Sequence, residues 1–324
     1  MDAAENINSG KLLKLPREYY EKSNLLTGLF LVYSTFLYVF PSLLIYWVIQ
    51  RAYFDVPLRI VTVLLLGLVA QQGLHLFGWI GHEGFHFNLV DNRMASAAIG
   101  LFFSALIFTH MGFGFALSHW DHHRFTNMEE DPDRKIFGRF KSFLPRLLFA
   151  RMTADWYYFK DNMRVAFGNP KKGYPLTSLQ QYLLAWGNVL ASTGWFTLYV
   201  WIIWRHPLAG FAAIGYPHIL VVMFTGLRPY FEHAGTETNL FQSSRTRVSV
   251  FLSTSYFFNN YHLEHHLYPK IPCYNLPKVH RYLKGLGVFA AEKSLIERGG
   301  WKDFRYATKR FQYKDLGFGA STPI

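Results

Sequence analysis

Long apolar runs separated by charged stretches dominate the sequence. Five segments approach the roughly 20 apolar residues that a helix needs to cross a hydrocarbon core, and they run over about 25–49, 60–80, 95–117, 182–204 and 208–227. Short polar links join the first segment to the second and the fourth to the fifth. Each of these two pairs therefore predicts a helical hairpin that returns the chain to the membrane face from which it started.

The third segment, 95–117, does not fit a simple crossing. A span there would place the histidine groups on either side of it in opposite leaflets, and Gly100, His110, Gly112 and Gly114 interrupt its apolar character. Irregular or re-entrant backbone is tolerated at membrane depth where it packs against protein. We therefore expect a re-entrant or interfacial helix pair in this segment.

Composition agrees with a membrane protein. Only 17% of the residues are charged, below the roughly 25% of soluble domains, and 51% are hydrophobic, which excludes an ordinary soluble globule and a disordered chain. The net charge of +12 is not accompanied by a nucleic-acid recognition motif, and most basic residues flank apolar runs, so no nucleic-acid partner is expected. The single cysteine, Cys273, cannot form an internal disulfide and fits a reducing compartment.

The basic residues also predict the orientation of the chain. With two hairpins, only Arg51, Arg59 and Arg205 lie on the far face, and the other 30 of the 33 lysines and arginines lie on the face of the histidine groups. Cytoplasmic loops are enriched in lysine and arginine, so this face is predicted to be cytoplasmic. We expect a single domain over 1–324, with a cytoplasmic N-terminal segment at 1–24 that shows no removable signal peptide, and a cytoplasmic C-terminal tail at 284–324.

Eight of the 14 histidines fall into three tight groups, which read HEGFH, HWDHH and HLEHH. Residues at positions i, i+3 and i+4 share one helix face, so each group presents its imidazoles along one edge, as a site for iron, zinc or copper requires. Eight imidazoles are too many for one metal of four to six ligands and indicate two metals. The eight candidates are His82, His86, His119, His122, His123, His262, His265 and His266.

A ninth candidate ligand is His233, which directly follows the last apolar segment and should emerge on the same face; the alternative is a histidine beside the site or in solvent. Glu83, Asp121 and Glu264 interrupt the groups at positions off the ligand face. There they could accept the second ring N–H of a ligand histidine, or, as an alternative, bridge the metals directly. His75 shares a helix face with His82 but lies deeper, and we expect it beside the site rather than on a metal.

These features together predict an all-α integral membrane protein. It would consist of four transmembrane helices in two hairpins, a re-entrant or interfacial helical segment, and a cytoplasmic helical cap that holds a di-metal site. No catalytic residue beyond the metal ligands and no residue for an organic cofactor is predicted. His110, His218 and His280 stand alone in the sequence and are expected to take no part in metal binding.

The three groups resemble the HxxxH, HxxHH and HxxHH boxes of the membrane fatty acid desaturase and hydroxylase superfamily. The flanking residues Thr126-Asn127, Asp131-Pro132-Asp133 and 260–269 are also similar to acyl-lipid desaturases. The resemblance covers about 25–283 and implies a mushroom-shaped fold with two iron ions (Fe2+/Fe3+), held by the nine histidines, and a hydrophobic tunnel. In some desaturases an asparagine four residues before the extra histidine holds a metal-bound water; Pro229 stands there in this chain and leaves a tenth ligand unassigned.

The resemblance implies a dioxygen-dependent di-iron oxidoreductase that desaturates or hydroxylates an unactivated C–H position of a fatty acyl lipid. With no haem-binding motif in the chain, a separate electron donor is expected, either a ferredoxin or a b-type cytochrome system. The alternatives are a carotenoid or other small-molecule hydroxylase or ketolase of the same superfamily, a zinc membrane hydrolase and a divalent-metal transporter. The position of the histidine groups at segment ends weighs against transport.

Overall fold

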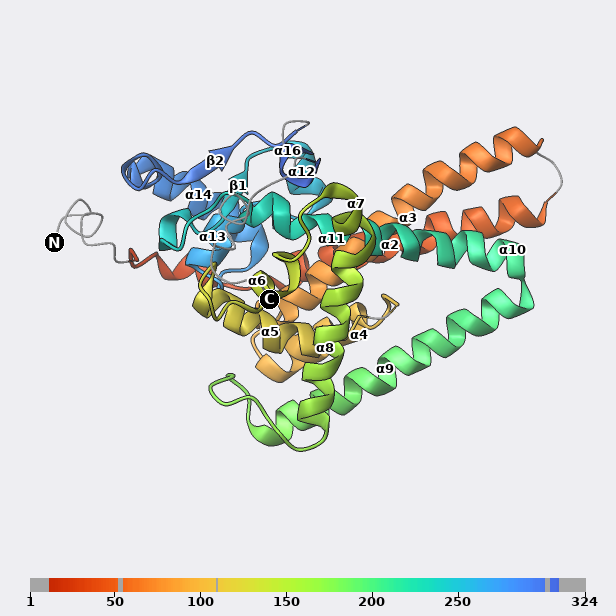
Figure 1. Cartoon of the computed structure of the whole chain (residues 1–324), viewed down its shortest axis with the longest axis horizontal. Helices are drawn as coiled ribbons and strands as arrows, with labels where there is room; N and C mark the ends of the chain where they lie inside the picture. The colour runs from red at the N-terminus through yellow and green to blue at the C-terminus, as the bar shows by residue number, and fades with distance from the viewer. Residues whose placement is uncertain (1–11, 52–54, 109, 301–303, 309–324) are drawn as a thin grey trace.

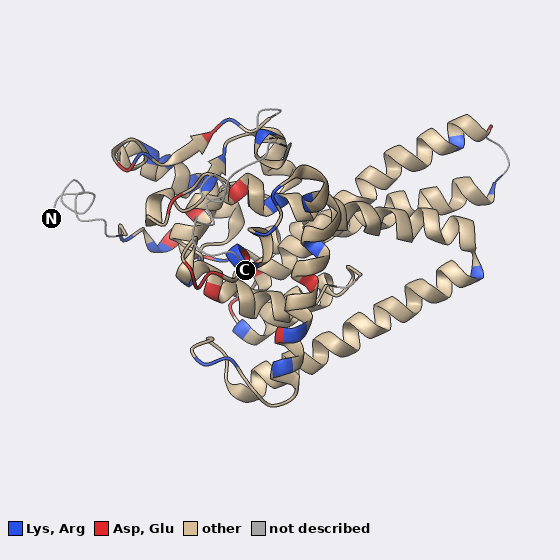
Figure 2. Ribbon diagram, viewed as in Figure 1, with Lys and Arg blue, Asp and Glu red and all other residues tan. Residues whose placement is uncertain are grey.

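The computed structural model describes residues 12–51, 55–108, 110–300 and 304–308. Two sets of long helices extend away from a domain of shorter helices (Figure 1). Charged residues gather on that domain and are sparse along the outer parts of the long helices, except near their tips (Figure 2). This separation of charge is what a membrane protein with a polar cap requires, because a charged side chain in hydrocarbon is costly.

The first hairpin consists of α2 (Asn24–Gln50) and α3 (Val56–Phe85), preceded by the short helix η1 (Arg17–Tyr20). Both long helices begin at a side-chain cap, since Ser23 accepts a hydrogen bond from the amide of Leu26 and Asp55 accepts one from the amide of Leu58. A Cβ atom at Gly73 would collide with the backbone of α2. Glycine at this position therefore allows the two helices to pack closely.

The segment 95–117 forms a helix pair, as expected. It divides into α4 (Arg93–Ser104) and α5 (Gly112–Phe125), and both helices are shorter than the roughly 20 residues of a membrane span. A Cβ atom on Gly84 would lie 2.6 Å from the Cα of Gly100, so α3 and α4 approach each other at these two glycines. Gly100, which interrupts the apolar run, thus allows α4 to pack closely against α3.

The second long unit contains α9 (Ser178–Arg205), α10 (Pro207–Gly210), the π-helical turn η3 (Phe211–Gly215) and α11 (Tyr216–His233). Within the described part of the chain, three helical stretches are long and apolar enough to cross a membrane: 17–50, 56–85 and 207–233. Helix α9 is long, but it is not one of these three. It carries the buried Asn188, whose side-chain oxygen accepts a hydrogen bond of 2.8 Å from the amide of Phe113 at the start of α5.

The remaining elements form the cap and lie mainly between α5 and α9 and after α11. The first part contains α6 (Pro132–Phe137), α7 (Phe143–Pro145), the π-helical turn η2 (Arg146–Ala150) and α8 (Arg151–Ala166). Two short parallel strands, β1 (Arg245–Arg247) and β2 (Leu295–Glu297), pair with Arg245 opposite Leu295. The rest of the cap consists of η4 (Leu240–Gln242), α12 (Val250–Ser255), α13 (His262–Leu267), η5 (Cys273–Asn275), α14 (Leu276–Gly285), α15 (Val288–Ala291) and α16 (Phe304–Thr308).

Candidate metal centre

The ends of four helices bring all nine predicted histidines together. A five-histidine group consists of His82, His86, His119, His123 and His265, and one ring nitrogen from each lies within 4.8 Å of the others. A four-histidine group is formed by His122, His233, His262 and His266, through the overlapping clusters His122-His233-His266 and Glu232-His233-His262. The two groups are adjacent, since the rings of His123 and His266 lie 4.4 Å apart between centroids.

The helical spacing of the boxes explains this division. Near the end of α5, His119 and His123 are one turn apart and join the five-histidine group, whereas His122 points to the other group. The short helix α13 also supplies both groups, but with the opposite share. His265 joins the five-histidine group, and His262 and His266, one turn apart, join the four-histidine group. Each HxxHH box therefore supplies both groups.

The spacing of ring nitrogens fits metal binding better than hydrogen bonding. The Nε2 atom of His123 lies 3.0 Å from Nε2 of His119 and 2.9 Å from Nε2 of His265. A ring nitrogen has either one proton or one lone pair and cannot serve both neighbours. Two imidazole nitrogens about 2.1 Å from one ion and at right angles lie about 3.0 Å apart, so these distances match ligands of a common metal.

Unpaired nitrogens support the same conclusion. The Nε2 atoms of His82 and His86 are buried and have no hydrogen-bond partner among the residues that the structure describes. In the four-histidine group, Nε2 of His262 lies 3.1 Å from Nε2 of both His233 and His266. Because buried polar atoms are nearly always paired in folded proteins, these nitrogens fit the binding of two metal ions.

The second ring nitrogen of several histidines is held by an oxygen. The ring of His122 donates from Nδ1 to Asp131 at 2.9 Å, His233 pairs through Nδ1 with the carbonyl of Ser243 at 3.0 Å, and His82 contacts Glu83 at 3.1 Å. Contacts of this kind fix the ring and leave Nε2 for a metal. The role of Glu83 in orienting a metal-bound ring stays a prediction, and its contact with His82 is compatible with that role.

Two other carboxylates lie away from the metal-binding rings, which corrects the prediction from the sequence. Asp121 forms a partly buried ion pair with Lys171, and Glu264 accepts hydrogen bonds from Thr246 and from Nδ1 of His280. The spacing shows only that these residues point off the ligand face, and their partners come from segments distant in the sequence. His280, which was expected to stand alone, is buried beside Glu264.

Two acidic residues at the site were missed. Asp131 also accepts a hydrogen bond from the amide of Asn127 at 2.8 Å, which folds the polar loop after α5 back onto His122. Glu232 lies in the last turn of α11 with His233 and His262. The polar run 126–133 was a signal for Asp131, whereas nothing in the spacing of the boxes indicates Glu232.

Electrostatics favours the neutral imidazole that a metal needs. Burial lowers the pKa of His86 to about 3, and burial together with neighbouring imidazoles keeps the pKa of His119 and His265 well below the usual value. His122 differs. Burial acts to lower its pKa, but the charges of Asp131 and Asp133 outweigh burial and raise it to about 9.

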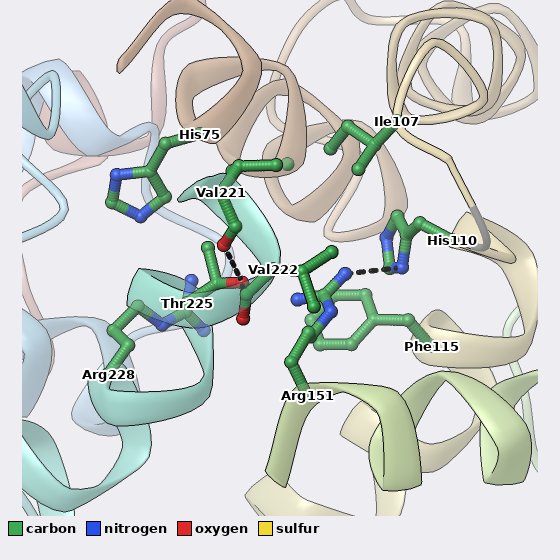
Figure 3. Close-up of a pocket in the computed structure, with 10 residues that line it drawn as sticks. His75, Ile107, His110, Phe115, Arg151, Val221, Val222, Thr225 and Arg228 are labelled. Atoms are coloured by element: carbon green, nitrogen blue, oxygen red, sulfur yellow. Dashed lines mark hydrogen bonds between the residues drawn. The ribbon is translucent and has the colours of Figure 1, made fainter. Parts of the chain in front are cut away.

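Two small cavities adjoin the centre. A cavity of about 30 Å³ is lined by both metal groups, and a second one of about 30 Å³ shares Arg151 and Arg228 with it and extends to His75. Figure 3 shows residues that line this second cavity, among them His75 and Arg228, with Arg151 bonded to His110. Such volumes hold a water molecule or two but no acyl chain. His75 itself belongs to neither group, as expected.

A larger pocket of about 540 Å³ reaches the five-histidine group at His86 and His123. Apolar and aromatic residues, among them Phe87 and Trp120, line part of it. A separate groove of about 620 Å³ lies between the long helices and is lined almost entirely by apolar and aromatic side chains. It does not touch either histidine group.

The fold and the site define a helical protein with membrane-length apolar helices and a candidate centre for two metals, built from nine histidines at helix ends. The family described as "Fatty acid desaturase" matches residues 55–292, and the chain belongs to this family. It is also similar to a beta-carotene ketolase of Paracoccus sp. (strain N81106 / MBIC 01143), with 26% identity over 204 residues that cover 61% of this chain and 71% of the ketolase. Family and relative together indicate a membrane oxidoreductase.

Proposed function

We propose that this protein is a dioxygen-dependent di-iron oxidoreductase that desaturates or hydroxylates an unactivated C–H position of a fatty acyl lipid. The observation that carries the proposal is the division of nine histidines into adjacent groups of five and four. Imidazole-rich sites without thiolates suit redox-active iron better than structural zinc, which favours closed tetrahedral sets. Iron bound here would supply the dioxygen chemistry that oxidises the C–H bond.

The polypeptide contributes geometry and exclusion of water. Asp131, Glu83 and the carbonyl of Ser243 orient three of the rings, and eight of the nine histidines are buried. Burial favours the neutral form of these rings, with His122 as the exception because Asp131 and Asp133 raise its pKa, and it limits access of bulk water to the centre. The substrate position relative to the two groups would decide between a second hydrogen abstraction, which gives an alkene, and hydroxylation.

The membrane topology is part of the proposal. Helix α9 would act as a fourth span beside the three apolar stretches, and α4 with α5 would lie at the membrane interface, with the single domain of residues 1–324 directing its cap to the cytoplasm. The excess of lysine and arginine on the cap supports this orientation (Figure 2). Of the two predicted cytoplasmic segments, 1–11, 301–303 and 309–324 lie outside the described residues.

The pocket of about 540 Å³ supports an acyl lipid as substrate. It reaches His86 and His123, and Lys22, Arg93, Arg124 and Lys270 surround it. Apolar residues such as Phe87 and Trp120, together with a basic rim in which Asp91 is the one acidic residue of the lining, suit an acyl chain that carries an anionic headgroup. Electrons would come from a separate donor, a ferredoxin or a b-type cytochrome system.

A carotenoid oxygenase is the second candidate. The similarity to the ketolase favours it, and so does the groove of about 620 Å³ between the long helices, where Tyr38, Trp195 and Trp201 could contact a neutral polyene. A neutral substrate has no use for the basic rim of the other pocket. The two candidates therefore differ in their dependence on that rim.

Product analysis tests the proposal. The protein and its His265→Ala variant are expressed in a host that makes both unsaturated lipids and carotenoids, and lipids and pigments are analysed by mass spectrometry. We expect new unsaturated or hydroxylated acyl chains with the unsubstituted protein alone. Unchanged acyl chains with oxidised carotenoids would support the second candidate, and no product of either kind would contradict both. Metal analysis and dioxygen uptake test the remaining alternatives. A zinc hydrolase would contain zinc, and neither it nor a divalent-metal transporter would consume dioxygen.

A further inference from the structure

Glu232 lies beside the four-histidine group although no histidine box contains it. It is 2% exposed, in the last turn of α11, and lines the same small cavity as His122, His233 and His262. Its Oε2 atom is 3.5 Å from Nε2 of His262, and a carboxylate oxygen falls within 4.8 Å of the ring nitrogens of His233 and His262. The carboxylate is therefore within reach of an ion that these two histidines share.

The two carboxylate oxygens of Glu232 have different surroundings. The Oε2 atom forms an ion pair with Nε of Arg228 at 3.3 Å. The Oε1 atom is buried and has no hydrogen-bond partner among the described residues. An unpaired carboxylate oxygen away from water is costly, so Oε1 is expected to have a partner that is not a protein group.

Arg228 explains how the carboxylate is held. Its guanidinium lies over the ring of Trp79 at 4.0 Å and binds Glu232 from the side, one turn earlier on the same helix. Arg228 thus fixes one oxygen and leaves the other directed to the cavity. A lysine would hold the carboxylate less rigidly, because its ammonium lacks the planar donor fork.

Two other carboxylates, Asp131 and Asp133, lie near the four-histidine group, and both face Nδ1 of His122, with Oδ2 of Asp133 at 3.7 Å from it. Asp131 uses both oxygens, for the ring of His122, the amide of Asn127 at 2.8 Å and the amide of Asp133 at 2.9 Å. The four-histidine group also has one donor fewer than its neighbour. Pro229, one turn before His233 on the same helix, supplies no side-chain donor.

We propose that Glu232 is the fifth protein ligand of the metal in the four-histidine group and that Arg228 positions its carboxylate. The inference rests on the proposed function, namely that two metal ions bind here. It makes the two metals chemically different, since one has five neutral nitrogen ligands and the other has four nitrogens and an anionic oxygen. The anionic ligand favours the higher charge state of its metal.

The test compares Glu232→Gln with Arg228→Gln, using iron content per chain and Mössbauer spectra of the purified protein reconstituted with 57Fe. Glutamine keeps the shape of the side chain and removes its charge. We expect Glu232→Gln to keep the iron of the five-histidine group and to lose about half of the total iron, whereas Arg228→Gln keeps nearly all of it. Loss of one of two iron environments in the Mössbauer spectrum would accompany the first result.

Two results would overturn the inference. One is an unchanged iron content and spectrum in Glu232→Gln. The other is a loss of iron in Glu232→Gln that is spread evenly over both iron environments, which would mean that the substitution disturbs the centre as a whole. If Glu232→Gln fails to fold, Glu232→His offers a neutral donor without an ion pair: retention of the iron supports a ligand role, and its loss from folded protein overturns it. Failure of the unsubstituted protein to bind two irons would instead refute the proposed function.

Discussion

Replacement of Asp131 by asparagine tests how the centre is supported. The carboxylate holds Nδ1 of His122 at 2.9 and 3.0 Å from its two oxygens and also accepts amide hydrogen bonds from the loop that follows α5. Asparagine keeps one acceptor for the ring but removes the charge. The ring is then less firmly oriented and its nitrogen is less basic toward a metal.

The size of the effect follows from comparable sites. Loss of a carboxylate that supports a metal-bound histidine lowers metal affinity about 10- to 100-fold, which corresponds to about 1.4–2.7 kcal/mol. Because the Asp131 side chain is fully buried beside a buried ring, water cannot replace the lost charge. We therefore expect the upper part of this range. Iron affinity is measured by competition with a chelator that forms a coloured ferrous complex.

Asp121 provides the matched control. It lies on α5 one residue before His122, but it pairs with Lys171 and not with a ring of either histidine group. Asp121→Asn is expected to leave iron affinity within about twofold of the unsubstituted protein, because no metal-binding ring depends on this carboxylate for its orientation. Equal affinities in Asp131→Asn and the unsubstituted protein, or a loss in Asp121→Asn as large as in Asp131→Asn, would refute the assignment of Asp131 as the supporting carboxylate.

Three further predictions concern ligands, protons and packing. His265→Ala removes a ligand of the five-histidine group, so product formation should become undetectable while the protein still inserts into membranes; substantial turnover in this variant would contradict its assignment. The pKa of His122 is raised to about 9 without metal, so a metal that binds this ring must displace a proton. The affinity of the four-histidine group for iron should therefore rise about tenfold per pH unit from pH 7 to 9 and then level off. An affinity for iron that does not change with pH would contradict this. Gly84→Ala places a Cβ atom 2.6 Å from the Cα atom of Gly100 and should destabilise the protein by about 1–3 kcal/mol in thermal unfolding. Gly28→Ala is the control, because its Cβ atom meets no atom within 4 Å. Equal stability of the two variants would argue against the close packing of α3 on α4.

The spacing of histidines was sufficient to predict which residues lie together, and their role as metal ligands stays a prediction. Imidazoles at i, i+3 and i+4 must share a helix face, and the structure brings all nine together. The division into five and four could not be predicted, because it depends on the angle at which each helix end meets the others. His122 and His123 are neighbours in the sequence, yet they belong to different groups.

The partners of the carboxylates depend on contacts over long distances in the sequence. Asp121 and Lys171 are 50 residues apart, and Thr246 approaches Glu264 only because β1 packs near α13. A residue's position on a helix face does not reveal such partners. Glu232 was missed for a related reason. A single acidic residue before a histidine forms no repeating pattern in the sequence, so nothing in the sequence indicates that it lies beside the histidine groups.

The fold was predictable where hydrophobic length decided it. The apolar runs correctly indicated the first hairpin and the last long helix, and the demand that all histidines share one face indicated the helix pair in 95–117. The fourth span stays a prediction. Helix α9 uses polar residues such as Asn188 to bind α5, and such tertiary contacts dilute the apolar pattern on which a span is recognised.

The central claim is that two irons held by nine histidines reduce dioxygen. Its most direct test measures metal content and reductant-dependent dioxygen uptake on the same purified sample, with and without added lipid. The account predicts about two irons per chain and an uptake that lipid stimulates and iron removal abolishes. Stoichiometric zinc in fully active protein, or turnover of substrate without dioxygen consumption, would contradict it.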